Sequence, residues 1–455
     1  MNDAKPPSRE GSLDAPTRHP LDWRSPDFTA DEPVYAELER VFDICHGCRR
    51  CVSLCTTFPT LFDFVDASDS GEVEAVPKEK FWEVVDQCYL CDMCYVVKCP
   101  YVPPHPWNVD FPHLMLRAKA YQFREGKMKH PVRDRLLSST DRNGKLATIP
   151  VVVQAVNAAA KSKPLRALGE KVAGVHRDAW LPQFATRKFR SGAAASKPHA
   201  VRDGERTPGK VAVFSTCYVN YNEPGIGHDL LAILDHNEVP YVLVEKEACC
   251  GMPKLEQGDL EAVEALMRRN IPQLAKLARA GYAIVTPVPS CTLMFKQELP
   301  LMFPDDEDVR VVRDAMFDPF EYLMARRRDG LLKTRFPRPL GKVAYHVPCH
   351  SRVQKIGLKT QEALEAVPET QVLTIERCSG HAGTWGVKKE FHESALKIGR
   401  PVMRQIADFA PDFFASDCQL AGHHLEDGIE RAGGKGGAQL KHPITLLRMA
   451  YGLPD

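Results

Sequence analysis

Cysteine is the residue type in this sequence whose number and spacing are best suited to chemistry. Eight of the 15 cysteines lie between residues 45 and 99. They form two runs, Cys45-x2-Cys48-x2-Cys51-x3-Cys55 and Cys88-x2-Cys91-x2-Cys94-x4-Cys99-Pro100. Three thiolates at this spacing wrap around one corner of an iron–sulfur cube, and the fourth ligand comes from the other run. We therefore expect one [4Fe–4S] cluster on Cys45, Cys48, Cys51 and Cys99, and a second on Cys88, Cys91, Cys94 and Cys55.

Structural zinc is the alternative for these two runs. A zinc site takes four ligands, usually as two CxxC pairs separated by a dozen or more residues. Two complete CxxCxxC triplets would each leave a thiol unused, so the spacing favours iron–sulfur clusters. The second run has four residues before its last cysteine where three are usual, which changes the loop geometry but not the number of ligands.

The remaining seven cysteines follow a repeat. Gly-Lys-Val-Ala begins eight residues before Cys217 and again eight residues before Cys349. Cys249-Cys250-Gly251 is then matched by Cys378-Ser379-Gly380, and Cys291 by Cys418, with offsets of 132, 129 and 127 residues. Three ordered landmarks predict a tandem duplication over the carboxyl-terminal half of the chain.

With these motifs the chain resembles the iron–sulfur proteins that carry the cysteine-rich "CCG" domain. Such domains occur in the B subunit of heterodisulfide reductase and in iron–sulfur subunits of glycolate oxidase and lactate-utilisation systems. Two CxxCxxC runs followed by two CCG domains are similar to the C subunits of anaerobic glycerol-3-phosphate dehydrogenases, as are ACCGMPKLEQGDLE and HPITLLRMAYG. The resemblance covers roughly residues 36–454.

The resemblance implies a further iron–sulfur centre in the CCG region. The first half keeps four candidate ligands, Cys217, Cys249, Cys250 and Cys291, although Val288 replaces a cysteine usual in the family. The second half keeps Cys349, Cys378 and Cys418, whereas Ser379 and Ala415 replace cysteines. His350 and His381 are candidate additional donors or hydrogen-bonded loop residues. A further possibility is that the two halves face each other across a pseudo-twofold axis and share one centre.

The function that the resemblance implies is electron transfer within a dehydrogenase complex. Electrons would come from a flavoprotein partner, cross the two ferredoxin-type clusters and leave through the CCG region to a quinone or another carrier. No GxGxxG follows a predicted strand, so we expect no flavin or nicotinamide site and no complete substrate site on this chain. A thiol–disulfide reductase of the heterodisulfide type, with substrate at Cys249-Cys250, and a metal-stabilised scaffold without redox activity are the two alternatives.

The elements that must position these cysteines are of two kinds, and we predict an α + α/β fold. Helical periodicity and first-turn prolines predict helices over residues 33–45, 59–65 and 77–87, which gives a helical two-cluster domain at 34–125. From residue 209 onward, β-branched runs such as 211–214 and 241–245 alternate with amphipathic helices. We expect α/β CCG domains at 209–335 and 336–455, with their cysteines at the carboxyl ends of strands.

Two further segments complete the predicted organisation. Residues 1–33 are rich in Pro, Asp, Ser and Gly, and we expect a disordered tail. Residues 126–208 form a helical, basic connector, with 12 Lys or Arg against four Asp or Glu between residues 161 and 210. This connector is either a solvated linker or an amphipathic contact with a membrane surface or an acidic partner.

Composition limits the remaining classes of protein. The 455 residues carry a formal net charge of only +1, so we expect no nucleic-acid partner. No run of 18 apolar residues and no secretory leader is visible, and unpaired thiols are usual in the cytosol. We therefore expect a cytoplasmic protein that can also lie on the inner face of the membrane.

Overall fold

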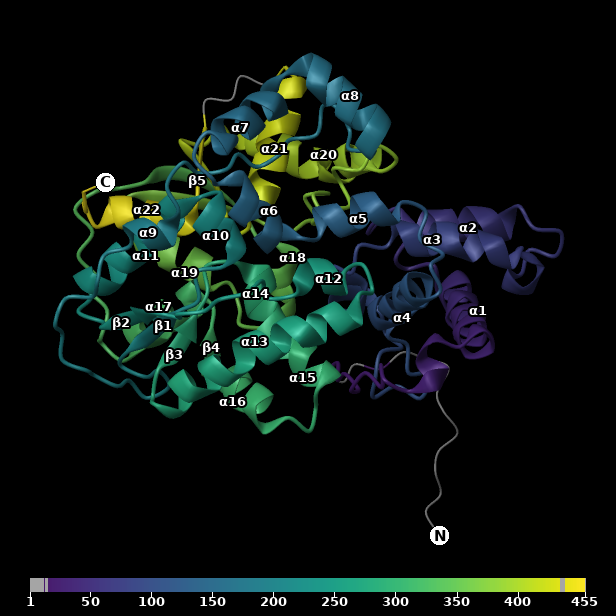
Figure 1. Cartoon of the computed structure of the whole chain (residues 1–455), viewed down its shortest axis with the longest axis horizontal. Helices are drawn as coiled ribbons and strands as arrows, with labels where there is room; N and C mark the ends of the chain where they lie inside the picture. The colour runs from purple at the N-terminus through teal and green to yellow at the C-terminus, as the bar shows by residue number, and fades with distance from the viewer. Residues whose placement is uncertain (1–11, 13–14, 434–437, 455) are drawn as a thin grey trace, which may run out of the picture. The chain divides into compact units, whose positions relative to one another are not determined.

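A computed structural model describes residues 12, 15–433 and 438–454. By its contacts the chain divides into two compact units. The amino-terminal unit contains residues 1–129, with 255–260 and 301–303, and the carboxyl-terminal unit contains the rest. Figure 1 labels most of the elements of both.

The amino-terminal unit is helical, as the sequence predicts. Its elements are η1 (Pro26–Thr29), α1 (Asp31–Cys48), α2 (Thr57–Asp66), η2 (Val73–Ala75), η3 (Lys78–Lys80), α3 (Phe81–Gln87), the π-helical turn η4 (Cys94–Lys98) and α4 (Phe111–Arg124). Leu38, Phe42, Phe58 and Phe81 are buried in one apolar core, against which most of the cysteines of the two runs pack.

Residues 15–33 differ from the disordered tail that their composition suggests. Arg18 is buried between two carboxylates and donates to Asp92 at 2.6 Å and to Asp110 at 2.9 Å. Trp23 is also buried, and its ring nitrogen donates to the carbonyl of Met302. Composition missed this because two buried side chains can fix a polar segment that has no periodicity of its own. The first 11 residues of the expected tail, with residues 13 and 14, lie outside the described part of the chain.

The predicted connector is helical only in its first part, since residues 174–188 and 193–208 form no helix. It contains α5 (Pro131–Leu137), α6 (Thr140–Ala147), α7 (Val152–Lys161), α8 (Lys163–Ala173) and α9 (Phe189–Gly192). An ion-pair network joins its first helix to the second cysteine-rich half: Arg133 pairs with Glu390 at 2.7 Å, and Lys388 pairs with Asp134 at 3.0 Å.

The two cysteine-rich halves have the same sheet topology. The first contains β1 (Val211–Val213), α10 (Cys217–Tyr221), α11 (Pro224–His236), β2 (Tyr241–Leu243), α12 (Met252–Leu255), α13 (Leu260–Arg279), β3 (Ala283–Val285), α14 (Pro289–Leu293), η5 (Met294–Glu298), α15 (Leu299–Met302), α16 (Glu307–Ala315), β4 (Met316–Phe317) and α17 (Pro319–Arg328). The second contains β5 (Gly341–His346), α18 (Cys349–Val353), α19 (Lys359–Glu365), β6 (Thr370–Ile375), α20 (His392–Phe409), β7 (Phe413–Ser416), α21 (Gln419–Arg431), β8 (Gln439–Lys441) and α22 (Pro443–Ala450).

The sheet order explains why distant cysteines meet. The orders are β2-β1-β3-β4 and β6-β5-β7-β8, and every pairing is parallel. The carboxyl ends of parallel strands lie at one edge of a sheet, where loops from both sides of the central strand converge. In each half, three successive strands are followed by a cysteine loop, so the repeat places three cysteine positions at each such edge.

Candidate iron–sulfur sites

The first cysteine run lies at the carboxyl end of helix α1. Cys45 and Cys48 are one helical turn apart in its last turn, and Arg49 (φ 51°) ends the helix in the left-handed conformation. This reversal turns Cys51 back toward the same side. Cys45, Cys48, Cys51 and Cys99 together line one cavity, which Phe58, Tyr101 and Val109 help to close. The structure thus brings together the four residues that the sequence predicts for one cluster.

The second run is wound by two left-handed residues. Leu90 (φ 52°) and Asp92 (φ 61°) lie between its first three cysteines, and this backbone conformation is uncommon for residues other than glycine. Arg18 secures the loop through Asp92. The extra residue before Cys99 is absorbed in the π-helical turn η4, where the Cys99 amide donates to the Cys94 carbonyl at 2.9 Å.

The electrostatics of these thiols indicate which cysteines are neighbours. Burial raises the pKa of Cys45 well above its usual range, and Cys99, Cys51 and Cys48 raise it further. Burial likewise raises the pKa of Cys94, with Cys91, Cys88, Cys51 and Cys55 adding to the shift. The pKa of Cys88 rises to about 12, mainly through burial.

These thiols fit iron–sulfur clusters by the chemistry of the donor set. Several thiolates packed together with little water repel each other and therefore need a cationic core to stay deprotonated. Among the described residues, no three His, Cys, Asp or Glu side chains are arranged to hold a single metal ion. The assignment of ligands to the two clusters stays a prediction.

In the first CCG half, the structure brings the four cysteines together. Cys249, Cys250 and Cys291 are buried. Hydrogen bonds from Cys217 and Cys250 lower the pKa of Cys249 well below its usual range, while the pKa values of those two thiols are raised. The four thiols thus form a chain of contacts in which Cys249 is the acceptor.

Two residues that the sequence analysis did not single out hold this cluster of thiols. The Thr140 hydroxyl, on helix α6, lies 3.4 Å from the sulfur of Cys217 and 3.5 Å from that of Cys249. Asn270, fully buried on helix α13, accepts from the Ala248 amide and donates to the carbonyls of Ala248 and Cys249. Neither residue lies in a cysteine motif, so no local pattern in one sequence could have identified them.

In the second half, the three cysteines follow strands as expected. Cys349 begins α18, Cys378 follows β6 and Cys418 precedes α21. The backbone favours glycine at the third position of the repeated triplet in both halves, since Gly251 (φ 102°) and Gly380 (φ 81°) have positive φ angles. Any side chain at Gly380 would also meet the Ala395 carbonyl.

The two candidate histidines behave differently. His350 pairs its Nδ1 with the Ser290 hydroxyl at 2.8 Å, and so links the residue beside Cys349 to the residue beside Cys291. His381 is buried, burial lowers its pKa to about 3, and its Nε2 has no hydrogen-bond partner among the described residues. The Ser290–His350 bond shows that the cysteine edges of the two halves face each other at this point.

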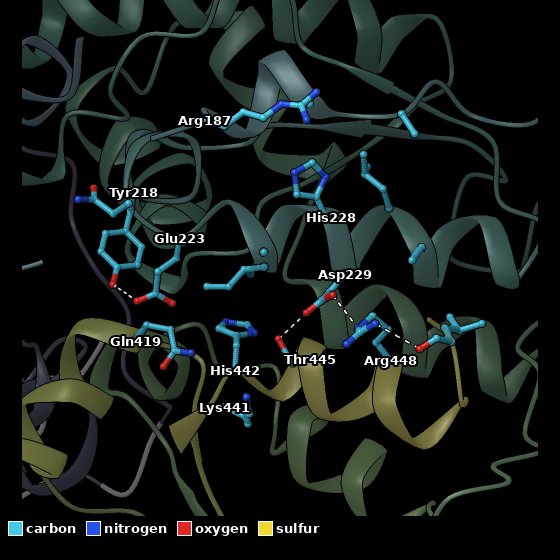
Figure 2. A pocket seen from close by; sticks show the side chains of 18 of the residues that line it. Arg187, Tyr218, Glu223, His228, Asp229, Gln419, Lys441, His442, Thr445 and Arg448 are labelled. Atoms are coloured by element: carbon cyan, nitrogen blue, oxygen red, sulfur yellow. Dashed lines mark hydrogen bonds and ion pairs between the residues drawn. The ribbon is translucent and has the colours of Figure 1, made fainter. Parts of the chain in front are cut away.

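A cavity of about 1270 Å³ opens elsewhere in the carboxyl-terminal unit, lined by residues of both halves and of the connector. Figure 2 shows Tyr218, Glu223, Asp229 and Arg448 among its lining. At one wall the Tyr218 hydroxyl donates to Glu223 at 2.5 Å, and His423 lies 3.0 Å from the same carboxylate. Tyr218 follows Cys217 in the chain, and Cys418 is near enough to contribute to its raised pKa, after burial and Glu223.

Comparison with known proteins supports this description of the carboxyl-terminal halves. The model of the cysteine-rich domain CCG matches residues 211–296 and again 343–426. The C subunit of the anaerobic glycerol-3-phosphate dehydrogenase of Escherichia coli K12 is 28% identical over 351 residues, which cover 76% of this chain and 83% of the relative. The two predicted cysteine-rich repeats are therefore confirmed as CCG domains.

Two further relatives cover shorter stretches. The B subunit of the fumarate reductase (CoM/CoB) of Methanothermobacter marburgensis is 28% identical over 254 residues, 54% of this chain and 48% of the relative. Lactate utilization protein A of Bacillus cereus is 28% identical over 189 residues, 39% of this chain and 75% of the relative. The sequence is thus similar to proteins named as subunits of a dehydrogenase and of a reductase.

Proposed function

Because this chain is a tandem CCG-domain protein similar to iron–sulfur subunits of dehydrogenase and reductase complexes, we propose that it transfers electrons for such a complex. The observation that carries the proposal is the set of four cysteines, three from the first run and one from the second, around one cavity. In the proposal, Cys45, Cys48, Cys51 and Cys99 hold one [4Fe–4S] cluster, and Cys88, Cys91, Cys94 and Cys55 hold the other. Such clusters supply one-electron transfer when bound.

The protein's own residues set the conditions for this chemistry. Arg18 fixes the second cysteine loop through Asp92. Phe58 and Val109 line the cavity of the first four cysteines and limit the access of water to it. Burial and hydrogen bonds are the means by which a protein tunes a bound cluster. Thr140 is placed to orient the sulfurs of Cys217 and Cys249, which with Cys250 and Cys291 would hold a third centre.

The proposed partners follow from the relatives and from the lack of a GxGxxG motif for a flavin or nicotinamide in the sequence. Similarity to one subunit of a dehydrogenase implies that other subunits accompany this chain, and we assign the two-electron substrate chemistry to a flavoprotein partner. The acceptor is a quinone or another carrier. The cavity beside Tyr218, Glu223 and His423 is large enough for a small organic acceptor, and it has a tyrosine, a carboxylate and an imidazole in hydrogen-bond contact at one wall.

Serine variants test the crossed ligand sets. Cys99→Ser and Cys55→Ser each remove the fourth ligand that one run gives to the other cluster. Purified anaerobically and reduced with dithionite, each variant should lose one electron paramagnetic resonance signal and keep the other, and the two losses should differ. The matched control, Cys378→Ser, should keep both signals. Loss of the same signal in both variants would refute the crossed assignment.

Turnover distinguishes the proposal from its alternatives. The reduced protein should be reoxidised by a soluble quinone analogue and should be inert toward organic disulfides. Catalytic reduction of a disulfide would instead support the thiol–disulfide reductase, and clusters that cannot be reduced reversibly would support a scaffold.

A further inference from the structure

Exposed apolar side chains gather in one short part of the chain. Of the 13 large aliphatic side chains exposed in the described residues, nine fall between residues 132 and 172. They are Val132, Leu136, Leu146, Ile149, Val151, Val152, Leu165, Leu168 and Val172. Scattered single apolar residues are normal on a surface, but such a concentration marks a contact site.

Helix α8 presents its apolar side to solvent. Leu165, Leu168 and Val172 recur at the spacing of one helix face and are 51%, 56% and 81% exposed. We refer to these three residues as the α8 stripe. An amphipathic helix of a water-soluble domain normally turns this face toward the core.

Polar contacts hold α8 in this orientation. Arg166 donates to the carbonyls of His176, Arg177 and Ala179, and Glu170 accepts from Arg177. These two residues lie one helical turn apart, on the side away from the stripe. Helix α7, labelled beside α8 in Figure 1, is held similarly, since Asn157 bonds the amide and carbonyl of Phe184.

The charged side chains exposed at the ends of α7 and α8 are lysines. Lys161, Lys163 and Lys171 are exposed at the ends of α7 and α8, and no ion pair is found for them in the described part of the chain. The one acidic residue of α8, Glu170, is paired with Arg177. The surface around the stripe is therefore apolar and cationic.

We propose that α7 and α8 dock on an anionic phospholipid surface, with the α8 stripe inserted among the acyl chains and the lysines at the headgroups. Lysine flanking an aliphatic face is the pattern of a helix that lies in the membrane interface. Protein interfaces are instead enriched in aromatic residues, methionine and arginine and depleted in lysine, and none of the nine exposed apolar side chains is aromatic. Among the described residues, none of the helices combines the length and the apolar character of a membrane span.

This inference deepens the proposed function, in which the acceptor is a quinone or another carrier, but it rests on different residues. The sequence alone suggests an amphipathic contact of the basic connector with a membrane surface or an acidic partner, without indicating which side chains make it. The exposed stripe adds an apolar contribution, and high salt should therefore weaken the binding without abolishing it.

Vesicle co-sedimentation of the full chain, purified anaerobically, tests the inference. Vesicles of phosphatidylcholine with 30% phosphatidylglycerol should bind the protein more tightly than vesicles of phosphatidylcholine alone. The triple variant L165Q/L168Q/V172Q keeps good helix formers and should bind at least about tenfold more weakly, because each apolar side chain withdrawn from water adds appreciably to affinity. The control V201Q, at an exposed valine outside α5–α8, should bind like the unmodified chain.

The outcomes separate this inference from the proposed function. The triple variant should retain its iron, its sulfide and its reduction by dithionite, since the stripe touches no cysteine. Unchanged vesicle binding by that variant would overturn the inference. So would absence of binding by the unmodified chain, or self-association through this face detected by sedimentation.

Discussion

The buried arginine of the amino-terminal segment offers a quantitative test of how the second cysteine loop is held. Arg18 is 7% exposed and Asp92 is 6% exposed at their side chains, and two hydrogen bonds of 2.6 and 2.9 Å join them. Replacing Arg18 by Met keeps an unbranched chain and leaves the buried Asp92 carboxylate without this partner. Removing one member of a buried ion pair costs about 3–5 kcal/mol.

The assay is urea unfolding, followed by iron–sulfur absorbance and by tryptophan fluorescence. With a denaturant dependence of about 2–3 kcal/mol per molar urea, the loss corresponds to a midpoint lower by about 1–2.5 M. The control Arg24→Met, at an exposed arginine stacked on Trp23, should lose less than about 1 kcal/mol.

A double variant isolates the ion pair. Arg18→Met with Asp92→Asn should recover part of the loss, since it removes the buried carboxylate that has lost its arginine, and Asn tolerates the left-handed conformation at this position. A midpoint shift below about 0.3 M in Arg18→Met would contradict the buried-pair reasoning.

Three further predictions concern the CCG halves. Gly380→Ala should destabilise by more than about 2 kcal/mol in urea unfolding, whereas Gly357→Ala, at a similar φ without a backbone clash, should cost clearly less; equal losses would contradict the clash with Ala395. Asn270→Leu removes three buried hydrogen bonds to residues 248 and 249, so it should lower the free energy of unfolding by about 3 kcal/mol. It should also speed alkylation of Cys249 in the iron-free protein. Unchanged stability and unchanged alkylation would show that Asn270 does not hold the Cys249 backbone in place. Burial lowers the pKa of His423, but hydrogen bonds with Glu223 and Glu426 outweigh it and raise the pKa to about 9. The contribution of protonated His423 to the free energy of unfolding is therefore fully present below about pH 6.5 and is lost as the pH rises through about 9. His423→Gln should remove that pH dependence of the urea midpoint, and an unchanged profile would refute the assignment.

Features encoded locally could be predicted from the sequence. The cysteine spacing identified the candidate ligands, and alternating strand and helix patterns identified the two α/β halves that the CCG matches confirm. Hydrophobic periodicity predicted the helices around the first cysteine run, because burial of one helix face leaves a regular trace in the sequence.

Contacts between distant residues could not be predicted. Arg18 lies 74 residues from Asp92, and Thr140 lies 109 residues from Cys249, so no short-range sequence pattern indicates either contact. The orientation of α8 is a different case. Periodicity shows that one face is apolar, but it does not say whether that face points inward, and here Arg166 and Glu170 decide it.

Iron, acid-labile sulfide and zinc per chain, measured after anaerobic purification, test the central claim most directly. Each [4Fe–4S] cluster contributes four irons and four sulfides, so the two cysteine runs predict about eight of each. About twelve of each would add a further centre, for which Cys217, Cys249, Cys250 and Cys291 are the proposed ligands. Zinc without sulfide would contradict the assignment of the cysteine runs and, with it, the proposed electron transfer.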